Sequence, residues 1–382
     1  MRYFDRLGTL LTCVGLAALV LLPLVVLKTN RILPGEPRSL LDVLPLWAGL
    51  GFYAVLALAA VTAVKAANAR LRLAVALGAI AIVVVAVAAA ASELTPLDNR
   101  VVRVSPGGAF WVLVIALGLL ATDALTRLQP GPLVRVACLG AFLALVLGAL
   151  ASGYFDDLSI MREYAVNATR FAREARQHVL LAFGSLLAAV VVALPLGILC
   201  HREARLRAAV LGTLNLVQTI PSIALFGILM VPLGALATAL PAAARLGVSG
   251  IGFAPAVIAL FLYSLLPIVA NTVVGLSRVS PAAVDAAHGM GLTGWQALRQ
   301  VELPLALPTI LTGIRIVLVQ NIGLATIAAL IGGGGFGAFV FQGIGQTAID
   351  LVLLGAIPTV ALAFSASVVL DALVDLTRGA SR

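Results

Sequence analysis

The chain has 382 residues, of which 62 % are hydrophobic and only 11 % are charged. Because soluble proteins carry about 25 % charged residues on average, this composition excludes a soluble globular protein. The net charge of +9 is a feature of many nucleic-acid-binding proteins, but here Lys and Arg are scattered between apolar runs and form no basic stripe. The sequence therefore predicts an integral membrane protein whose basic residues set its topology, with no nucleic-acid partner.

Hydropathy divides the chain into ten apolar segments that are long enough to cross a bilayer. Each is predicted to be an α-helix, because lipid offers no partner to unpaired backbone groups and the alternation typical of barrel strands is absent. The expected fold class is therefore an all-α polytopic membrane protein with about ten transmembrane helices. The predicted spans are residues 7–27, 44–64, 73–91, 108–122, 133–151, 179–200, 208–230, 251–276, 309–330 and 351–371.

Two further apolar stretches, 231–250 and 331–350, are interrupted by Pro or Gly and are expected to be loops or re-entrant segments. The first span, 7–27, is too long for the core of a signal peptide and is followed by no small-residue cleavage site, so it is predicted to remain uncleaved. With both termini in the cytoplasm, the inner segments hold 14 Lys and Arg residues and the outer ones 10. This excess favours cytoplasmic N- and C-termini.

Residues 152–178 are the most polar stretch of the chain and divide it into three parts. Residues 1–151 form a membrane region of about five helices, and residues 179–382 form a second region with the remaining five. The divider mixes charged and apolar side chains in a pattern that indicates an amphipathic helix on the outer membrane surface, or alternatively a solvated linker helix. Five plus five spans also suggest an inverted-repeat transporter, although the two halves share no residue-level match.

The loop at 280–304, predicted to lie on the inner side, contains the signals for two short helices. Ser280 is a suitable N-cap for the first, with Pro281 at its first position and Gly289 or Gly291 at its end.

In the second helix of this loop, Thr293 and Gln296 have the spacing of a capping box, and Pro304 is expected to terminate the helix. One face of this second helix is apolar, through Trp295, Leu298 and Val301. An ordered loop with an apolar face favours a docking element, with a surface helix lying on lipid as the alternative.

The same loop resembles the EAA loop of ABC importer permeases, with Asp in place of the usual Glu and Val in place of the usual Ile. The matched residues are Asp285-Ala286-Ala287, Gly291, Val301 and Leu303-Pro304. The spacers between them are three, nine and one residues long. In that family the loop forms a coupling helix that seats in a groove of a cytoplasmic ATPase. The resemblance implies that seven residues couple this chain to such an ATPase: Asp285, Ala286, Ala287, Gly291, Trp295, Leu303 and Pro304.

Further stretches resemble the permeases for glycine betaine, choline, carnitine and related osmoprotectants. They are 218–222, 266–272, 313–315, 325–326 and 331–337, so the resemblance covers residues 179–382. It implies a permease core of the methionine-importer type, and the long N-terminal region is similar to one subgroup. The implied partners are an ATPase dimer, a second permease chain, identical or a sister, and a periplasmic or lipid-anchored binding protein. The implied location is the bacterial inner membrane.

Polar residues within the spans are the candidates for a translocation pathway, where they would offer weak hydrogen bonds to a small solute. They are Gln218, Thr219, Ser222, Asn271, Gln320 and Asn321, and Pro221 is included with them as the residue that bends the helix. Each also has a structural interpretation. The polar groups around Pro221 can satisfy a carbonyl that the proline leaves free, and the Asn and Gln side chains can form hydrogen bonds between helices. For a single residue, the structural interpretation is slightly favoured.

Arg315 is the only charge well inside a predicted span. Such a residue costs roughly 2.5 to 3.5 kcal/mol on insertion scales, so it must pair, snorkel or face water. A structural role near the coupling loop is favoured over contact with solute.

The chain contains no phosphate-binding loop, so it is not expected to be an enzyme. ATP and Mg²⁺ would bind to the partner ATPase, and no cofactor is expected here. The three His residues are isolated, without metal-ligand spacing. The main hypothesis is the permease subunit of an ATP-driven osmoprotectant importer. The alternative, an ion-coupled secondary transporter, would require an intramembrane carboxylate pair that the spans lack.

Overall fold

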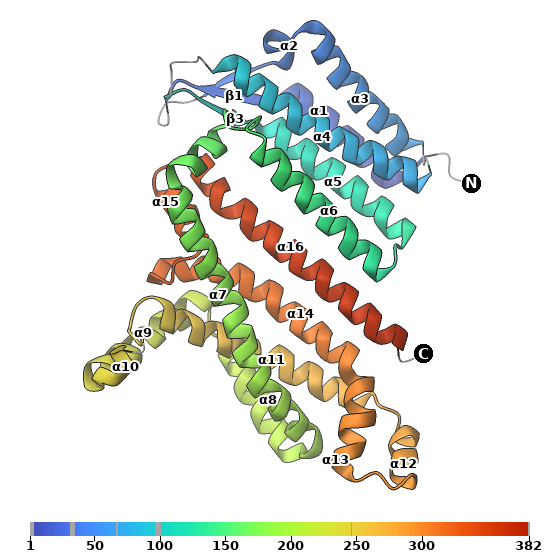
Figure 1. Cartoon of the computed structure of the whole chain (residues 1–382), viewed down its shortest axis with the longest axis vertical. Helices are drawn as coiled ribbons and strands as arrows, with labels where there is room; N and C mark the ends of the chain where they lie inside the picture. The colour runs from blue at the N-terminus through green and yellow to red at the C-terminus, as the bar shows by residue number, and fades with distance from the viewer. Residues whose placement is uncertain (1–3, 31–34, 66–67, 96–100, 246, 381–382) are drawn as a thin grey trace. The chain divides into compact units, whose positions relative to one another are not determined.

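The computed structural model describes residues 4–30, 35–65, 68–95, 101–245 and 247–380. These form two compact units, which are described separately: Met1–Gly131 with Gly140–Val166, and Pro132–Leu139 with Asn167–Arg382. Within the described residues, nine helices are long and apolar enough to cross a membrane, and α1 is a shorter apolar helix (Figure 1). The protein is thus an all-α polytopic membrane protein, as predicted.

The first unit contains helices and a small antiparallel sheet with strand order β2-β1-β3. Its elements are α1 (Arg6–Leu21), β1 (Val25–Lys28), β2 (Glu36–Arg38), α2 (Leu40–Val43), α3 (Leu46–Val64), α4 (Ala69–Leu94), β3 (Arg103–Pro106), α5 (Gly108–Leu128), most of α6 (Pro132–Ala151) and the start of α7 (Ser159–Arg202). The span predicted for 7–27 is wrong over residues 22–27. Pro23 favours an extended Leu22, so α1 ends at Leu21 and the chain enters β1.

A group of charged side chains links α1, α4 and α5 in this unit. Asp5 caps α1 by accepting the Gly8 N–H at 2.9 Å, and its carboxylate lies 2.8 Å from Arg72 and 2.6 Å from Arg127. Arg72 is 1 % exposed and also lies 3.2 Å from Asp123. The pKa of Asp5 lies well below its ordinary value. The hydrogen bond from Arg72 lowers it most, those from Gly8 and Arg127 lower it further, and burial acts in the opposite direction by raising it.

We expect Asp5→Asn to lower the free energy of unfolding by about 1–3 kcal/mol at pH 7, because it leaves the buried Arg72 guanidinium short of one charged partner. The folded pKa of Asp5 is depressed, so its contribution is present above the unfolded pKa of about 3.9 and lost as pH falls below it. Thermal unfolding of the full chain at pH 7 and near pH 3 measures this difference. A difference between wild type and variant that stayed constant with pH would contradict the prediction. Glu36→Gln, in an exposed pair with Arg38, is the control and should change little.

The second unit contains the segment that resembles permeases. Its elements are the rest of α7, α8 (Ala204–Thr219), α9 (Ser222–Ala239), α10 (Pro241–Arg245), α11 (Phe253–Ser277), α12 (Pro281–Gly289), α13 (Gly294–Ala297), a π-helical turn (Leu298–Glu302), α14 (Leu303–Ile327), a 3₁₀ turn (Ala328–Ile331), α15 (Gly337–Gly345) and α16 (Ile349–Ala380). A core of fully buried residues joins α7, α11 and α14 and includes Ala189, Ala193, Ile268, Val317 and Ile322. Small residues on α7 let these helices approach closely.

Three predicted boundaries differ from the structure. Residues 159–202 form one helix of 44 residues, so the polar segment is the first half of α7 rather than a separate surface helix. The span predicted for 208–230 is wrong, because Pro221 favours an extended Ile220 and the helix breaks there into α8 and α9. Most of 231–250, expected as loop or re-entrant, is helical in α9 and α10.

Candidate functional site

The loop at 280–304 is called the coupling loop below, after the family loop that it resembles, and its predicted capping signals are present. Ser280 accepts the Ala283 N–H at 3.3 Å and begins α12, with Pro281 in its first turn. The helix ends at Gly289, and Gly291 turns the chain at φ +83°, a conformation that favours glycine. The two short helices of the loop are therefore fixed by its own sequence.

The second short helix also has its capping box: Thr293 accepts the Gln296 N–H at 3.4 Å, and Gln296 accepts the Thr293 N–H at 2.8 Å. The prediction that Pro304 terminates this helix is wrong. The helix widens into the π-helical turn at Leu298–Glu302 and continues directly into α14, with Pro304 in the first turn of α14. In the π turn Leu303 donates to the Leu298 carbonyl five residues back, a widening that accommodates the proline.

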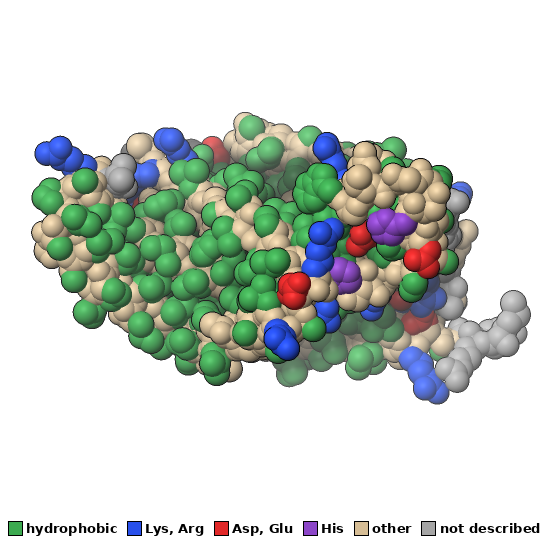
Figure 2. Space-filling model, turned by 90° about the horizontal axis from the view of Figure 1, so that it is seen from below, with side chains coloured by type: hydrophobic (Ala, Val, Ile, Leu, Met, Phe, Trp, Pro, Cys, Tyr) green, Lys and Arg blue, Asp and Glu red, His purple; other side chains and the backbone are tan. Residues whose placement is uncertain are grey.

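The seven candidate coupling residues divide into an exposed set and a set that packs against the base of the loop. Asp285, Ala286, Gly291, Trp295 and Pro304 are exposed, and Trp295 is 64 % exposed. Ala287 and Leu298 are buried, and Leu303 packs at the edge of the small core that Leu298 helps to form. The loop thus presents a charge and a large aromatic ring outward from a fixed base. Viewed from the end at which α12 and α13 lie, hydrophobic side chains cover most of the visible surface, and the histidine and most acidic side chains lie in its right half, while Lys and Arg are also seen at the left edge (Figure 2).

The C-terminal end of α7 lies beside this loop. Arg202 donates to the Gly294 carbonyl at 3.5 Å, and His201 lies 3.3 Å from the Ser277 hydroxyl at the end of α11. The loop and the α7–α8 turn are therefore on the same end of the unit, and the polar first half of α7 extends toward the opposite end.

The helix break at Pro221 is held by Tyr263 of α11. Gln218 donates to the Tyr263 carbonyl at 2.9 Å, and the Tyr263 hydroxyl donates to the Ile220 carbonyl. A carbonyl left without a helical partner at the break is thereby satisfied. Of the neighbouring candidates, Thr219 bonds to the Leu216 carbonyl at 2.7 Å, and Pro221 and Ser222 begin α9.

Asn321 is fully buried and joins three helices. Its amide donates to Ser185 of α7 and to Ser264 of α11, both at 2.9 Å. Asn321 therefore forms hydrogen bonds between helices, as its structural interpretation predicts. Ser185 and Ser264 were not among the sequence candidates.

Two other pathway candidates, Asn271 and Gln320, are half-buried. The Asn271 amide bonds to the Pro267 carbonyl of its own helix at 2.8 Å, and a Cβ at Gly313 would lie 2.7 Å from Asn271 Cβ. α11 and α14 therefore approach closely at this point, with Gly313 making the space.

Arg315 forms an ion pair with Asp371, which links α14 to α16. The side chains are 30 % and 45 % exposed, so the pair is partly open to its surroundings. The structure thus gives Arg315 a helix-linking partner. Asp371 was not predicted as this partner, because it lies at the last position of its predicted span.

The glycine run after Ile331 forms a loop that is held by α7, a contact between distant segments that was not predicted from the sequence. Gly332, Gly334 and Gly335 have positive φ. Glu174 accepts the Gly335 N–H at 2.9 Å, and Gln177 donates to the Gly333 carbonyl at 2.8 Å.

His178 forms a third hydrogen bond between α7 and this loop: its Nδ1 accepts the Phe336 N–H at 3.3 Å. His178 is fully buried and Glu174 is 6 % exposed. The spacing of residues 174, 177 and 178 places all three on one face of the helix, so a polar stripe in α7 was the available signal.

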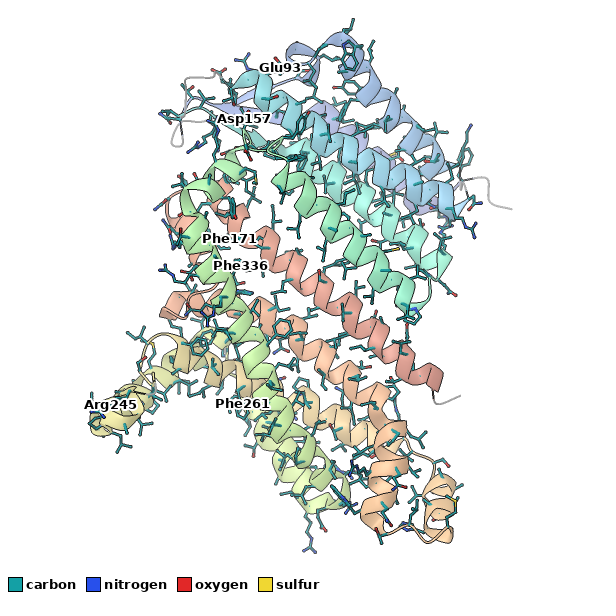
Figure 3. The ribbon with its side chains drawn as sticks, viewed as in Figure 1. Glu93, Asp157, Phe171, Arg245, Phe261 and Phe336 are labelled. Atoms are coloured by element: carbon teal, nitrogen blue, oxygen red, sulfur yellow. The ribbon has the colours of Figure 1, made fainter. Side chains whose placement is uncertain are left out.

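Aromatic rings extend the contact between α7 and α15. Phe171 lies beside Phe336, with ring centroids 5.4 Å apart, and also near Phe339 at 6.0 Å (Figure 3). Arg170 lies 4.9 Å over the Phe339 ring and donates to the Gln342 side chain at 2.6 Å. The polar half of α7 thus packs against the glycine loop and α15.

Comparisons with known proteins found matches for both parts of the chain. Residues 193–379 match the family described as binding-protein-dependent transport system inner membrane component, and residues 5–161 match the N-terminal domain of ABC transporter permease YehY. The osmoprotectant import permease OsmW of Salmonella typhimurium is 46 % identical over 50 % of this chain and 84 % of its own length. The carnitine transport permease OpuCD of Listeria monocytogenes is 37 % identical over 54 % of this chain and 86 % of its own.

A solved chain from inward-facing structures of the MetNI methionine ABC transporter is similar to 54 % of this chain and 95 % of its own, at 22 % identity and a TM-score of 0.47. The sequence relatives, which this chain covers over most of their length, define the family. The chain is therefore a multi-pass inner-membrane protein that belongs to the binding-protein-dependent ABC importer permeases, in the branch of the osmoprotectant permeases, with a YehY-type N-terminal domain.

Proposed function

We propose that this chain is the membrane permease of an ATP-driven importer for osmoprotectants such as glycine betaine or choline. The observation that carries the proposal is the 46 % identity to an osmoprotectant import permease over 84 % of that protein. The capped and exposed loop at 280–304 supports it, because it offers a rigid surface to a separate subunit.

In the proposed assembly, two permease chains, identical or related, enclose one pathway, and an ATPase dimer binds the loops at 280–304. ATP and Mg²⁺ bind to the ATPase, where hydrolysis occurs, and this chain holds no cofactor of its own. A periplasmic or lipid-anchored binding protein delivers solute on the other side. Both termini lie in the cytoplasm, in line with the Lys and Arg distribution.

Transport in this proposal is alternating access. ATP draws the ATPase subunits together and moves the attached α12 and α13. Because α13 continues through the π turn into α14, displacement of the loop is transmitted to the helix that meets α7 and α11 at Asn321. ATP shifts the equilibrium only through its differential binding to the two states.

We expect Asp285→Lys to abolish uptake while the protein still inserts, because Asp285 is exposed on α12 and the change reverses its charge at the proposed ATPase surface. Asp285→Glu keeps the charge and should retain uptake. ATP-dependent solute uptake in proteoliposomes that contain the complete importer measures both variants. Wild-type uptake and ATPase binding in Asp285→Lys would refute the assigned role of the loop. Uptake that needs an ion gradient but no ATPase would instead identify a secondary transporter.

A further inference from the structure

A hollow of about 360 Å³ opens beside the polar half of α7. Its lining combines two guanidinium groups, an amide, an aliphatic side chain and an aromatic ring. The residues are Arg173, Arg176, Gln177 and Leu180 of α7 and Phe253, the first residue of α11. The coupling loop and the pathway candidates contribute no residue to it.

The two arginines give this hollow an excess of positive charge. Among the residues that the structure describes, Arg176 has no ion-pair or hydrogen-bond partner. The Arg173 side chain is 70 % exposed, and within the described part of the chain it forms an ion pair with Glu174, whose Oε1 is 3.5 Å away. Glu174 already accepts the Gly335 N–H through its other oxygen. Both guanidinium groups therefore remain open to an external anion.

The apolar part of the lining is also open. Phe253 is 42 % exposed and Leu180 is 48 % exposed, so the ring and the aliphatic side chain are not fully covered within the chain. An aromatic face attracts a cation, most strongly one that is poorly hydrated. The hollow thus presents anion-binding groups and a cation-binding face within one small volume.

The hollow lies near the middle of α7, far from the C-terminal end of this helix that contacts the coupling loop. About 25 residues separate Gln177 from Arg202, which contacts that loop, and at 1.5 Å per residue they span roughly 38 Å. This exceeds the hydrocarbon thickness of about 30 Å. If the loop is cytoplasmic, as the proposed function requires, the hollow faces the outer aqueous phase, and the inference below rests on that function.

We propose that this hollow binds a zwitterionic solute that has a carboxylate at one end and a quaternary ammonium at the other. Arg173 and Arg176 bind the carboxylate through charge-assisted hydrogen bonds, and the Phe253 ring contacts the methylated ammonium. The volume is at the small end of the range for ligand sites, which suits a small solute. Gln177 lines the hollow and also donates a hydrogen bond to the Gly333 carbonyl, so the bound solute lies next to the glycine loop that contacts α7.

The test compares glycine betaine with choline, which has the same ammonium group but no carboxylate. The full chain is purified in dodecyl maltoside without choline lipids, and saturation-transfer NMR of the N-methyl protons gives both affinities. We expect betaine to bind more tightly than choline. Arg176→Gln should weaken betaine about tenfold and leave choline unchanged, since it removes only the carboxylate contact. Phe253→Leu should weaken both solutes, and Arg205→Gln, at an exposed arginine of α8, should change neither.

Equal affinities for the two solutes, or betaine binding that survives Arg176→Gln, would overturn the proposal. Phosphatidylglycerol is added in a separate arm: if it binds through Arg176 and betaine does not bind, the hollow is a lipid-headgroup site and the proposal is wrong. ATP-driven uptake by the complete importer is measured in parallel. Absence of uptake with an intact betaine binding pattern refutes the proposed function alone, whereas normal uptake without that pattern refutes the inference alone.

Discussion

Replacing Trp295 with alanine is expected to abolish ATP-driven uptake while the chain still folds and inserts. The indole is 64 % exposed on α13, so its truncation removes little packing within the chain. At the proposed interface with the ATPase, an exposed Trp on a rigid helix is the type of residue that dominates binding. Loss of such an anchor costs about 2–4 kcal/mol, which corresponds to roughly 30- to 1,000-fold weaker binding.

The matched control is Trp47→Ala, at a tryptophan that is 78 % exposed on α3 in the first unit. Binding of the purified ATPase to each variant, together with uptake in proteoliposomes, separates loss of docking from loss of folding. If Trp295→Ala bound the ATPase as tightly as wild type, α13 would not be the docking surface. If Trp47→Ala lost binding equally, the effect would not be specific to the loop.

Gly337→Ala is the second change with a large expected effect. An added Cβ would lie 1.8 Å from the Thr326 carbonyl oxygen and 2.7 Å from its carbon, both backbone atoms that no rotamer change can move. α15 would have to separate from the end of α14, which disrupts the packing of Phe336 and Phe339 against α7. We expect a loss of more than about 3 kcal/mol in stability, and loss of uptake with it.

Gly345→Ala is the control for this prediction, because a Cβ at that position meets nothing within 4 Å. It should leave thermal unfolding of the purified chain and uptake near wild type. A Gly337→Ala variant with unchanged unfolding would show that α15 moves at little cost, and would contradict the close packing on which the prediction depends.

The coupling loop was predictable from sequence because its structure is local. Ser280, Thr293 and Gln296 bond to backbone groups within three residues, and those bonds need no contact from another part of the chain. Pro304 was misjudged for a related reason. The rule that proline ends a helix assumes an α-helical turn before it, and the π turn at Leu298–Glu302 changes that geometry.

The helix break at Pro221 was only partly predictable. Pro221 identified a distortion, and Gln218 was recognised as a group able to repair it. The other partner, Tyr263, lies 43 residues from Ile220 along the chain and became evident only in the folded structure. The same holds for Asn321, whose partners Ser185 and Ser264 come from two other helices.

The amino-acid sequence by itself determined the membrane class, most of the helices and the capped helices of the loop at 280–304, since hydropathy and helix caps act over a few residues. Only the tertiary structure decided that Glu174, Gln177 and His178 hold the glycine loop and that Arg315 pairs with Asp371. The physical reason is that a polar group within an apolar helix must find a partner, and which distant residue supplies it depends on how the helices pack.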